Sequence, residues 1–292
     1  MPAEKLKIIT APSSIKIFSY SSPYDGIVVS PPSDLIWYQR DNSVWFSFRQ
    51  LSIFENFRHG VFSRVGGFSQ TPYAECNVSF KLGNRGDTLK NYLKIADNIG
   101  TKKIVHIQQV HGDTIENISL WPETEIVPIA DAMVTDLHDL GLMIKLADCQ
   151  GIIIYDPVKH VLGMVHSGWR GNVINIVSKT INKMVLDYDC NPSDMHTAFG
   201  PSLGPCCAEF KSWRDIFPEY FEQFMTVDNY FDLWAITCYQ LINAGVKPEH
   251  IELAAICTKC NRSWFFSYRG EVETGRFGVI AFLNPLGYSS SC

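Results

Sequence analysis

Short apolar runs alternate with polar, turn-prone clusters along most of this chain. From Val44 onward the apolar runs have the length of β-strands, and turn signals such as Gly66-Gly67 separate them. Three segments instead repeat their apolar positions every third or fourth residue, which predicts helices over residues 89–99, 173–186 and 230–244. Strands and helices therefore interleave, and the pattern predicts an α+β fold.

The N-terminal part is less regularly patterned than the rest. Proline- and serine-rich clusters at residues 12–14, 21–23 and 31–33 separate its short apolar runs. The sequence has no internal repeat, no low-complexity tract and no glycine- and serine-rich linker. We therefore predict a single main domain over residues 56–292, with residues 1–55 as an N-terminal extension packed on it.

The most informative stretch is residues 142–171, which predicts a hairpin of buried strands. Residues 143–146, 151–155 and 161–165 are apolar enough to be buried strand segments, and Asp156 begins a turn between the last two. Cys149 and His166 then fall at strand ends. A rigid scaffold positions side chains at such places while a cleft still reaches them, which favours a functional role.

His111 also follows an apolar stretch, at the turn Gln109-Val110-His111-Gly112-Asp113. Two imidazoles and a thiolate make a three-ligand set, and zinc sites that leave the fourth position to water are catalytic. From residue types alone, the ordinary alternatives stay open: a cysteine that only packs and histidines that only make simple hydrogen bonds.

Composition excludes several classes of protein. Hydrophobic residues make up 46% of the 292 residues and charged residues 19%, which is typical of globular proteins. The formal net charge is -5, and no segment concentrates lysine and arginine, so we expect no polymeric nucleic acid partner. No apolar run approaches the roughly 20 residues that span a bilayer, so we expect no membrane association.

Cysteine usage and the N-terminal residues favour a cytoplasmic protein. The nine cysteines form an odd number without the spacing of a small disulfide scaffold, which predicts reduced thiols. The first ten residues lack the apolar core of a signal peptide. A second metal site or a redox role at Cys206, Cys207, Cys257 and Cys260 stays open, because one C-x-x-C spacing is a weak signal.

Several motifs occur in the order found in a known family. The sequence resembles the laccase-domain, or multicopper polyphenol oxidase-like, family, whose members are regarded as purine nucleoside phosphorylases with adenosine deaminase activity. The motifs are HGVFSRVGG (59–67), NVSFKLG (77–83), QQVHG (108–112), ADAMVTD (130–136), LADCQGI (146–152), HSGWRG (166–171), GPSLGPCC (200–207), FFSYRG (265–270) and TGRFG (274–278).

The resemblance implies a fold, a metal and substrates. The implied fold is a four-layer α/β/β/α arrangement of mixed sheets flanked by helices, and His111, Cys149 and His166 match the family's three zinc ligands. The implied reaction converts adenosine, inosine, guanosine or methylthioadenosine and phosphate into free base and ribose 1-phosphate. The chain departs from the family where Ser167 replaces a common alanine and where Gly270 replaces a frequent second arginine.

The implied chemistry assigns roles to further residues. Arginine matches phosphate oxygens with two parallel hydrogen bonds, so Arg64 and Arg170 are candidate phosphate ligands, with a structural ion pair as the alternative. Asn77 is a candidate contact to the ribose or base, or else a turn residue. Deamination needs a zinc-bound water, and Asp148 is the nearest candidate proton shuttle, unless it only binds backbone amides. Trp169, Trp264, Phe265 and Tyr268 are candidates to stack on a purine, or else core residues.

Two other activities remain as alternatives. One is a metal-free cysteine hydrolase or deamidase with Cys149 as nucleophile and His166 as base. The other is a copper-dependent polyphenol oxidase, since copper accepts the same ligands and replaces zinc readily in vitro. A multicopper site needs many more imidazoles than eight histidines without a His-x-His pair provide. The sequence does not determine the preferred nucleoside, the balance of phosphorolysis and deamination, the oligomeric state or the role of the N-terminal extension.

Overall fold

Two large mixed sheets form the centre of the molecule. The computed structural model describes residues 5–17, 19–121 and 127–287. In this part of the chain the first sheet has the strand order β1 (Lys7–Ile9), β3 (Ile36–Arg40), β4 (Ser43–Ser47), β5 (Phe57–Phe62), β16 (Phe277–Leu283), β9 (Leu140–Leu146) and β6 (Lys103–His106). The second has the order β2 (Val28–Ser30), β15 (Ile251–Ala254), β12 (His196–Phe199), β10 (Gln150–Asp156), β11 (Val161–Ser167), β8 (Ala132–Thr135) and β7 (Ile115–Asn117).

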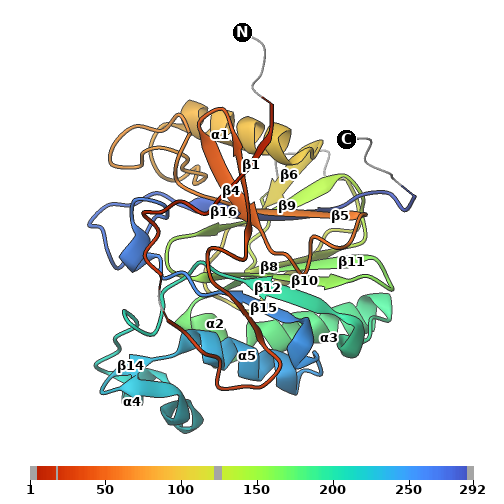
Figure 1. Cartoon of the computed structure of the whole chain (residues 1–292). Coiled ribbons are helices and arrows are strands. Elements are labelled where there is room, and N and C mark those ends of the chain that lie inside the picture. The colour runs from red at the N-terminus through yellow and green to blue at the C-terminus, as the bar shows by residue number, and fades with distance from the viewer. Residues whose placement is uncertain (1–4, 18, 122–126, 288–292) are drawn as a thin grey trace.

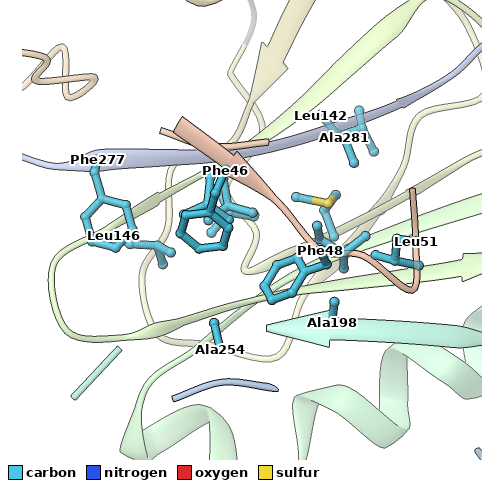
Figure 2. Close-up of a cluster of buried hydrophobic side chains, with 14 of the residues drawn as sticks. Phe46, Phe48, Leu51, Leu142, Leu146, Ala198, Ala254, Phe277 and Ala281 are labelled. Carbon is cyan, nitrogen blue, oxygen red and sulfur yellow. The ribbon is translucent and has the colours of Figure 1, made fainter. Parts of the chain in front are cut away.

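The sheets pack face to face and enclose the main core. Phe46, Leu142 and Phe277 of the first sheet and Ala198 and Ala254 of the second belong to one cluster of buried side chains (Figure 2). The central strands β9, β10 and β11 are buried on both faces, so they read as nearly continuous apolar runs. This burial explains why the strand-length runs stood out in the sequence.

Helices cover the two outer faces and complete four layers (Figure 1). Helix α1 (Arg85–Ile99) packs on the first sheet through Tyr92 and Ile95, while α2 (Trp169–Ile174), α3 (Ile176–Tyr188) and α5 (Leu233–Asn243) cover the second. The predicted single α+β domain with four layers is therefore confirmed. Short elements complete the described chain: α4 (Trp213–Ile216), β13 (Met225–Val227), β14 (Tyr230–Phe231), and the 3-10 turns η1 (Pro192–Asp194), η2 (Glu219–Phe224), η3 (Pro248–His250) and η4 (Lys259–Asn261).

All three predicted helices differ from the structure at their boundaries. The helix predicted over residues 89–99 begins earlier, at Arg85. The helix predicted over residues 173–186 is divided into α2 and α3 at Asn175, which has a left-handed φ of 53° and caps α3 by accepting a hydrogen bond from the Ser178 amide. The helix predicted from residue 230 begins at Leu233, because Asp232 caps it through the Ala235 amide. Side-chain capping, rather than apolar periodicity, sets the last two boundaries.

The chain passes from one sheet to the other at residues 147–149. Strand β9 pairs with β16 in the first sheet, whereas β10 and β11 form an antiparallel hairpin in the second. Asp156 accepts hydrogen bonds from the Val158 and Lys159 amides and so begins the predicted turn. The stretch predicted as one hairpin therefore supplies strands to both sheets, and Cys149 lies at the crossing.

Residues of the predicted N-terminal extension pair with both sheets. Strands β1, β3 and β4 occupy one side of the first sheet, and β2 pairs in parallel with β15 in the second. The division at residue 55 stays a prediction; residues 1–4 and 18 of the extension and residues 288–292 of the main domain lie outside the described residues. None of the described helices is long and apolar enough to cross a membrane.

Candidate metal centre

The structure brings His111, Cys149 and His166 together at one end of the second sheet. Cys149 immediately precedes β10, and His166 lies in the neighbouring strand β11, where it pairs with Gly151. His111 lies in the loop between β6 and β7 with a left-handed φ of 62°. Their ligand atoms all lie within 4.8 Å of one another, and 3.8 Å separates Cys149 Sγ from His111 Nε2.

Asp131 positions both histidines. Its buried carboxylate lies 2.8 Å from His166 Nδ1 and accepts hydrogen bonds from the amides of Val110, His111 and Gly112 at 3.1, 2.9 and 2.7 Å. Because a carboxylate only accepts, Nδ1 of His166 carries the proton and Nε2 remains available as a ligand atom. Sequence reasoning missed Asp131, although it lies in the quoted motif ADAMVTD.

The local electrostatics favour a charged carboxylate and a thiolate. Burial alone would raise the pKa of Asp131, but the His166 and backbone hydrogen bonds prevail and lower that pKa below its ordinary value. Burial would also raise the pKa of Cys149, but the His166 and His111 rings lower it to about 6. Conversely, burial would lower the pKa of His166, whereas Cys149 and Asp131 raise it to about 9. The centre thus stabilises the thiolate that a metal or an electrophile needs.

Gly168 leaves room for this cluster. A Cβ atom at this position would lie 2.7 Å from Cys149 Sγ and 3.6 Å from a carbon of the His111 ring. We therefore expect Gly168→Ala to displace the thiolate and to weaken metal binding by at least about tenfold, the effect typical of disturbing the support of a metal ligand. Competition with a chromogenic chelator measures this affinity.

Gly112→Ala is the matched control for that prediction. A Cβ at Gly112 would make only ordinary contacts, 3.6 Å from Asp131 Oδ2 and from a Val110 methyl group. The Gly112→Ala variant also keeps the backbone amide that donates to Asp131. Equal metal affinity in the two variants would contradict the proposed steric role of Gly168.

The cluster opens into a pocket of about 720 Å³ between the two sheets' loops. Among the described residues, five lysine and arginine side chains line it, and Asp148 is the carboxylate of that described lining. Aromatic rings and amide side chains add apolar and hydrogen-bonding surface, so the pocket suits a flat polar molecule together with an anion. The basic residues are Lys81, Lys145, Arg170, Arg269 and Arg276; the aromatic ones are Phe80, Trp169, Phe210 and Tyr268.

Lys145 lines the pocket although sequence reasoning did not propose it, and Arg276, an arginine of the TGRFG motif, lines it as well. Lys145 belongs to the buried strand β9, where the surrounding apolar run conceals it, and its Nζ donates to the Ile107 carbonyl at 2.8 Å. Burial, with a contribution from Lys81, lowers the pKa of Lys145 to about 8. Arg276 precedes β16, and burial lowers its pKa below the ordinary value.

Asp148 has hydrogen-bond partners for both of its oxygens. Oδ1 accepts from the hydroxyls of Thr258 at 2.6 Å and Ser267 at 2.7 Å, and Oδ2 accepts from the Arg269 amide at 2.6 Å. Its backbone has a left-handed φ of 85°. The residue therefore ties two loops to the segment before Cys149, and its role as a proton shuttle stays a prediction.

The three predicted substrate ligands lie in different surroundings. Arg170 lines the pocket with its guanidinium 4.3 Å from the Trp169 ring centre. Arg64 is outside the lining, pairs with Glu271 at 2.8 Å and donates to the Ala74 carbonyl. Asn77 is fully buried and holds the backbone of Arg276 and Leu82. Arg64 and Asn77 thus have structural partners, and their contact with substrate stays a prediction.

The aromatic candidates divide in the same way. Trp169 and Tyr268 line the pocket, whereas Trp264 and Phe265 do not. Phe265 is fully buried in the core between the sheets. Phe80 and Phe210 line the pocket without having been proposed from the sequence.

This chain is similar in sequence to known proteins. Residues 58–284 match the family model described as multi-copper polyphenol oxidoreductase laccase. The chain is 28% identical over 252 residues to purine nucleoside phosphorylase YlmD of Geobacillus stearothermophilus, covering 77% of this chain and 88% of that relative. It is 29% identical over 230 residues to purine nucleoside phosphorylase LACC1 of Mus musculus, covering 73% of this chain but 52% of that relative. The chain thus spans about half the length of the mouse protein.

Solved structures share the fold. The crystal structure of YlmD from Geobacillus stearothermophilus superposes with a TM-score of 0.74 at 26% identity, covering 84% of this chain and 97% of that one. The Bacillus licheniformis hypothetical protein YfiH superposes with the same TM-score of 0.74 at 24% identity. Both cover most of this chain and establish its architecture.

Proposed function

This chain belongs to the multi-copper polyphenol oxidoreductase laccase family, and from that premise we propose that it is a zinc-dependent purine nucleoside phosphorylase. Its substrates are adenosine, inosine, guanosine or methylthioadenosine with phosphate, and its products are the free base and the sugar 1-phosphate. Adenosine deamination is a side activity. The names of the relatives support the first part of this proposal.

The observation that supports it best is the charge of the pocket beside the metal-ligand cluster. A chain with a net charge of -5 places five lysine and arginine side chains around this pocket, against one carboxylate among the residues of the lining that the structure describes. That carboxylate, Asp148, is occupied by hydrogen bonds. An anionic co-substrate such as phosphate explains this concentration of positive charge, which a hydrolase using water does not need.

The residues of the cluster fit a zinc ion. His111 and His166 offer imidazole nitrogens, Cys149 offers a thiolate, and Asp131 fixes the His166 tautomer from behind. Three protein ligands would leave a fourth coordination position for water or substrate. Bound zinc would supply a Lewis acid and, from its bound water, hydroxide at neutral pH.

The chain's own residues then provide binding and orientation. Phosphorolysis passes through an oxocarbenium-like state, as glycoside hydrolysis does, with phosphate as the attacking group. Lys145, Arg170 and Arg276 neutralise the phosphate and hold it against the sugar, while the rings of Trp169 and Tyr268 offer flat surfaces to the purine.

Phosphate binding is expected to weaken at alkaline pH. Lys145 attracts phosphate only while it is protonated, and its pKa is about 8, so the charge is lost as the pH rises through that value. The KM for phosphate should therefore rise roughly tenfold between about pH 7 and pH 9. Lys145→Arg stays charged over this range and should abolish that rise. Initial rates at varied phosphate and pH measure it.

Lys102→Arg is the matched control, because Lys102 is exposed on the surface and pairs with Asp139. Its pH profile should equal that of the unmodified protein. If Lys145→Arg also keeps the alkaline rise in KM, Lys145 does not bind phosphate.

A second candidate function has one observation in its favour. The Cys149 thiolate, the His166 ring and the Asp131 carboxylate follow one another as nucleophile, base and orienting group. A metal-free cysteine hydrolase or deamidase uses the same order. For the copper oxidase alternative, ligand groups of three or more among the described residues are limited to this cluster and a group of four cysteines. Neither provides the many imidazoles of a multicopper site.

One experiment tests these functions together. Metal-analysed protein is incubated with adenosine, inosine or methylthioadenosine, with and without phosphate, and free base and ammonia are followed by chromatography. Base release that requires phosphate and disappears on zinc chelation supports the proposed function. Hydrolysis that survives chelation supports the cysteine hydrolase. Absence of base and ammonia from zinc-loaded protein contradicts the nucleoside proposal.

A further inference from the structure

Four cysteines from two distant segments meet outside the pocket. Cys206 and Cys207 follow β12, and Cys257 and Cys260 follow β15. The sulfur of Cys206 lies 3.7 Å from those of Cys207 and Cys260, and 3.6 Å separates Cys207 from Cys260. All four sulfur atoms lie within 4.8 Å of one another, and each cysteine is a free thiol.

The sheet itself creates this meeting point. Strands β12 and β15 are parallel neighbours, so their carboxyl ends reach the same edge. Beyond the strands the pairing continues, because the Ser202 amide donates to the Ile256 carbonyl and the Thr258 amide donates to the Ser202 carbonyl, at 3.2 and 3.0 Å. The two cysteine pairs are thus held by backbone hydrogen bonds, not only by contacts among the sulfur atoms.

We propose that Cys206, Cys207, Cys257 and Cys260 bind one zinc ion in a closed, structural four-thiolate site. Zinc–sulfur bonds of about 2.3 Å in a tetrahedron place the sulfur atoms about 3.8 Å apart. The separations of 3.6 to 3.7 Å among the sulfur atoms of Cys206, Cys207 and Cys260 agree with that edge length, and the Cys257 sulfur lies within 4.8 Å of all three. An iron–sulfur cluster holds its cysteines farther apart, because several irons and sulfides lie between them.

Backbone amides also support the cluster from outside. The amides of Gly204 and Cys260 donate hydrogen bonds to the Cys257 sulfur. Hydrogen bonds of this kind orient the ligands of metal sites.

The proposed zinc would stabilise the loops that contact Asp148 in the pocket lining. The Leu203 amide donates to the Asp148 carbonyl at 2.8 Å, and Thr258 donates to the Asp148 carboxylate. Both partners lie a few residues from the cysteines. The four-thiolate site therefore fixes the two loops that hold the residue before Cys149, without contributing a ligand to the pocket.

The zinc content of matched variants tests the proposal. Protein purified without reductant or chelator should contain about two zinc ions per chain, one at each site. Cys149→Ala should keep about one, held by the four cysteines, and Cys257→Ser should lose one while keeping the pocket ion. Cys238→Ala is the control, because it removes a buried thiol outside both clusters and should keep the full content.

A second measurement protects the test against failure of Cys257→Ser to fold. Cobalt-loaded Cys149→Ala protein should show the intense thiolate-to-cobalt absorption of a tetrahedral four-sulfur site. Cys260→His should retain the ion but alter this spectrum, because three cysteines and a histidine also form closed sites. Zinc absent from Cys149→Ala protein would overturn the proposal. Iron in place of zinc would also overturn it. So would a disulfide bond, which would appear as two fewer reactive thiols than the nine cysteines when the chain is denatured without reduction.

Discussion

Replacing Cys149 by alanine is expected to abolish phosphate-dependent base release. The substitution removes the sulfur that lies 3.8 Å from His111 and that the two imidazoles stabilise as a thiolate. Disturbing an outer partner of a metal ligand costs roughly 10- to 100-fold, so removal of the ligand itself should lower kcat/KM by more than about 100-fold. The measurement is release of hypoxanthine from inosine at saturating phosphate.

The fold should tolerate this change. Cys149 lies at a partly exposed crossing between the sheets, so thermal unfolding should differ little from that of the unmodified protein. Cys190→Ala serves as a control, because it deletes a buried thiol remote from the pocket and should keep full activity. Phosphorolysis by Cys149→Ala at the unmodified rate would contradict the proposed centre.

Asp131→Asn is expected to weaken both the centre and the fold. Four donors surround the carboxylate, namely the His166 ring and the amides of Val110, His111 and Gly112. Each carboxylate oxygen of Asp131 accepts from two of these donors. Whichever way the asparagine amide is turned, its NH2 group would therefore face hydrogen-bond donors instead of acceptors. We expect roughly 10- to 100-fold weaker zinc binding and about 3 kcal/mol lower free energy of unfolding.

The pH dependence of this contribution has a definite sign. Since the pKa of Asp131 is lowered in the folded protein, its stabilising effect is present above the ordinary carboxyl pKa and is lost as the pH falls below it. Urea unfolding at neutral and acidic pH should show a smaller difference between Asp131→Asn and the unmodified protein at acidic pH. Asp113→Asn, at an exposed carboxylate that pairs with Lys179, is the control. A constant difference across the pH range would contradict this role.

Much of the fold followed from apolar patterning, because most strands are buried on both faces. The four-layer arrangement, in contrast, was implied by the family motifs and not by periodicity. Periodicity also failed at helix boundaries. Asn84, Asn175 and Asp232 each accept a hydrogen bond from an amide of the first turn that follows, and those contacts begin α1, α3 and α5. An asparagine or aspartate before an apolar run is a helix-start signal in the sequence. These residues locate the helix starts better than the spacing of apolar positions does.

The candidate site was predictable where a motif places chemistry at a strand end, as with Cys149 and His166. It was not predictable where function depends on a distant partner. Arg64 pairs with Glu271, more than 200 residues away in sequence, and Asn77 holds Arg276. Lys145 belongs to an apolar strand, and only the fold shows that it faces the pocket. Cys206 and Cys260 likewise meet through parallel strands that the sequence cannot pair.

The strand pairing has a consequence for how the chain reaches its folded state. β2 pairs with β15 through Val28 and Glu252, and β5 pairs with β16 through Phe57 and Leu283. During synthesis, β2 and one edge of β5 therefore stay unpaired until strands more than 200 residues later in the sequence have been made. Such high contact order favours slow folding and leaves apolar strand edges exposed in the interval. We therefore expect the nascent chain to be most prone to aggregation before β15 and β16 have been synthesised.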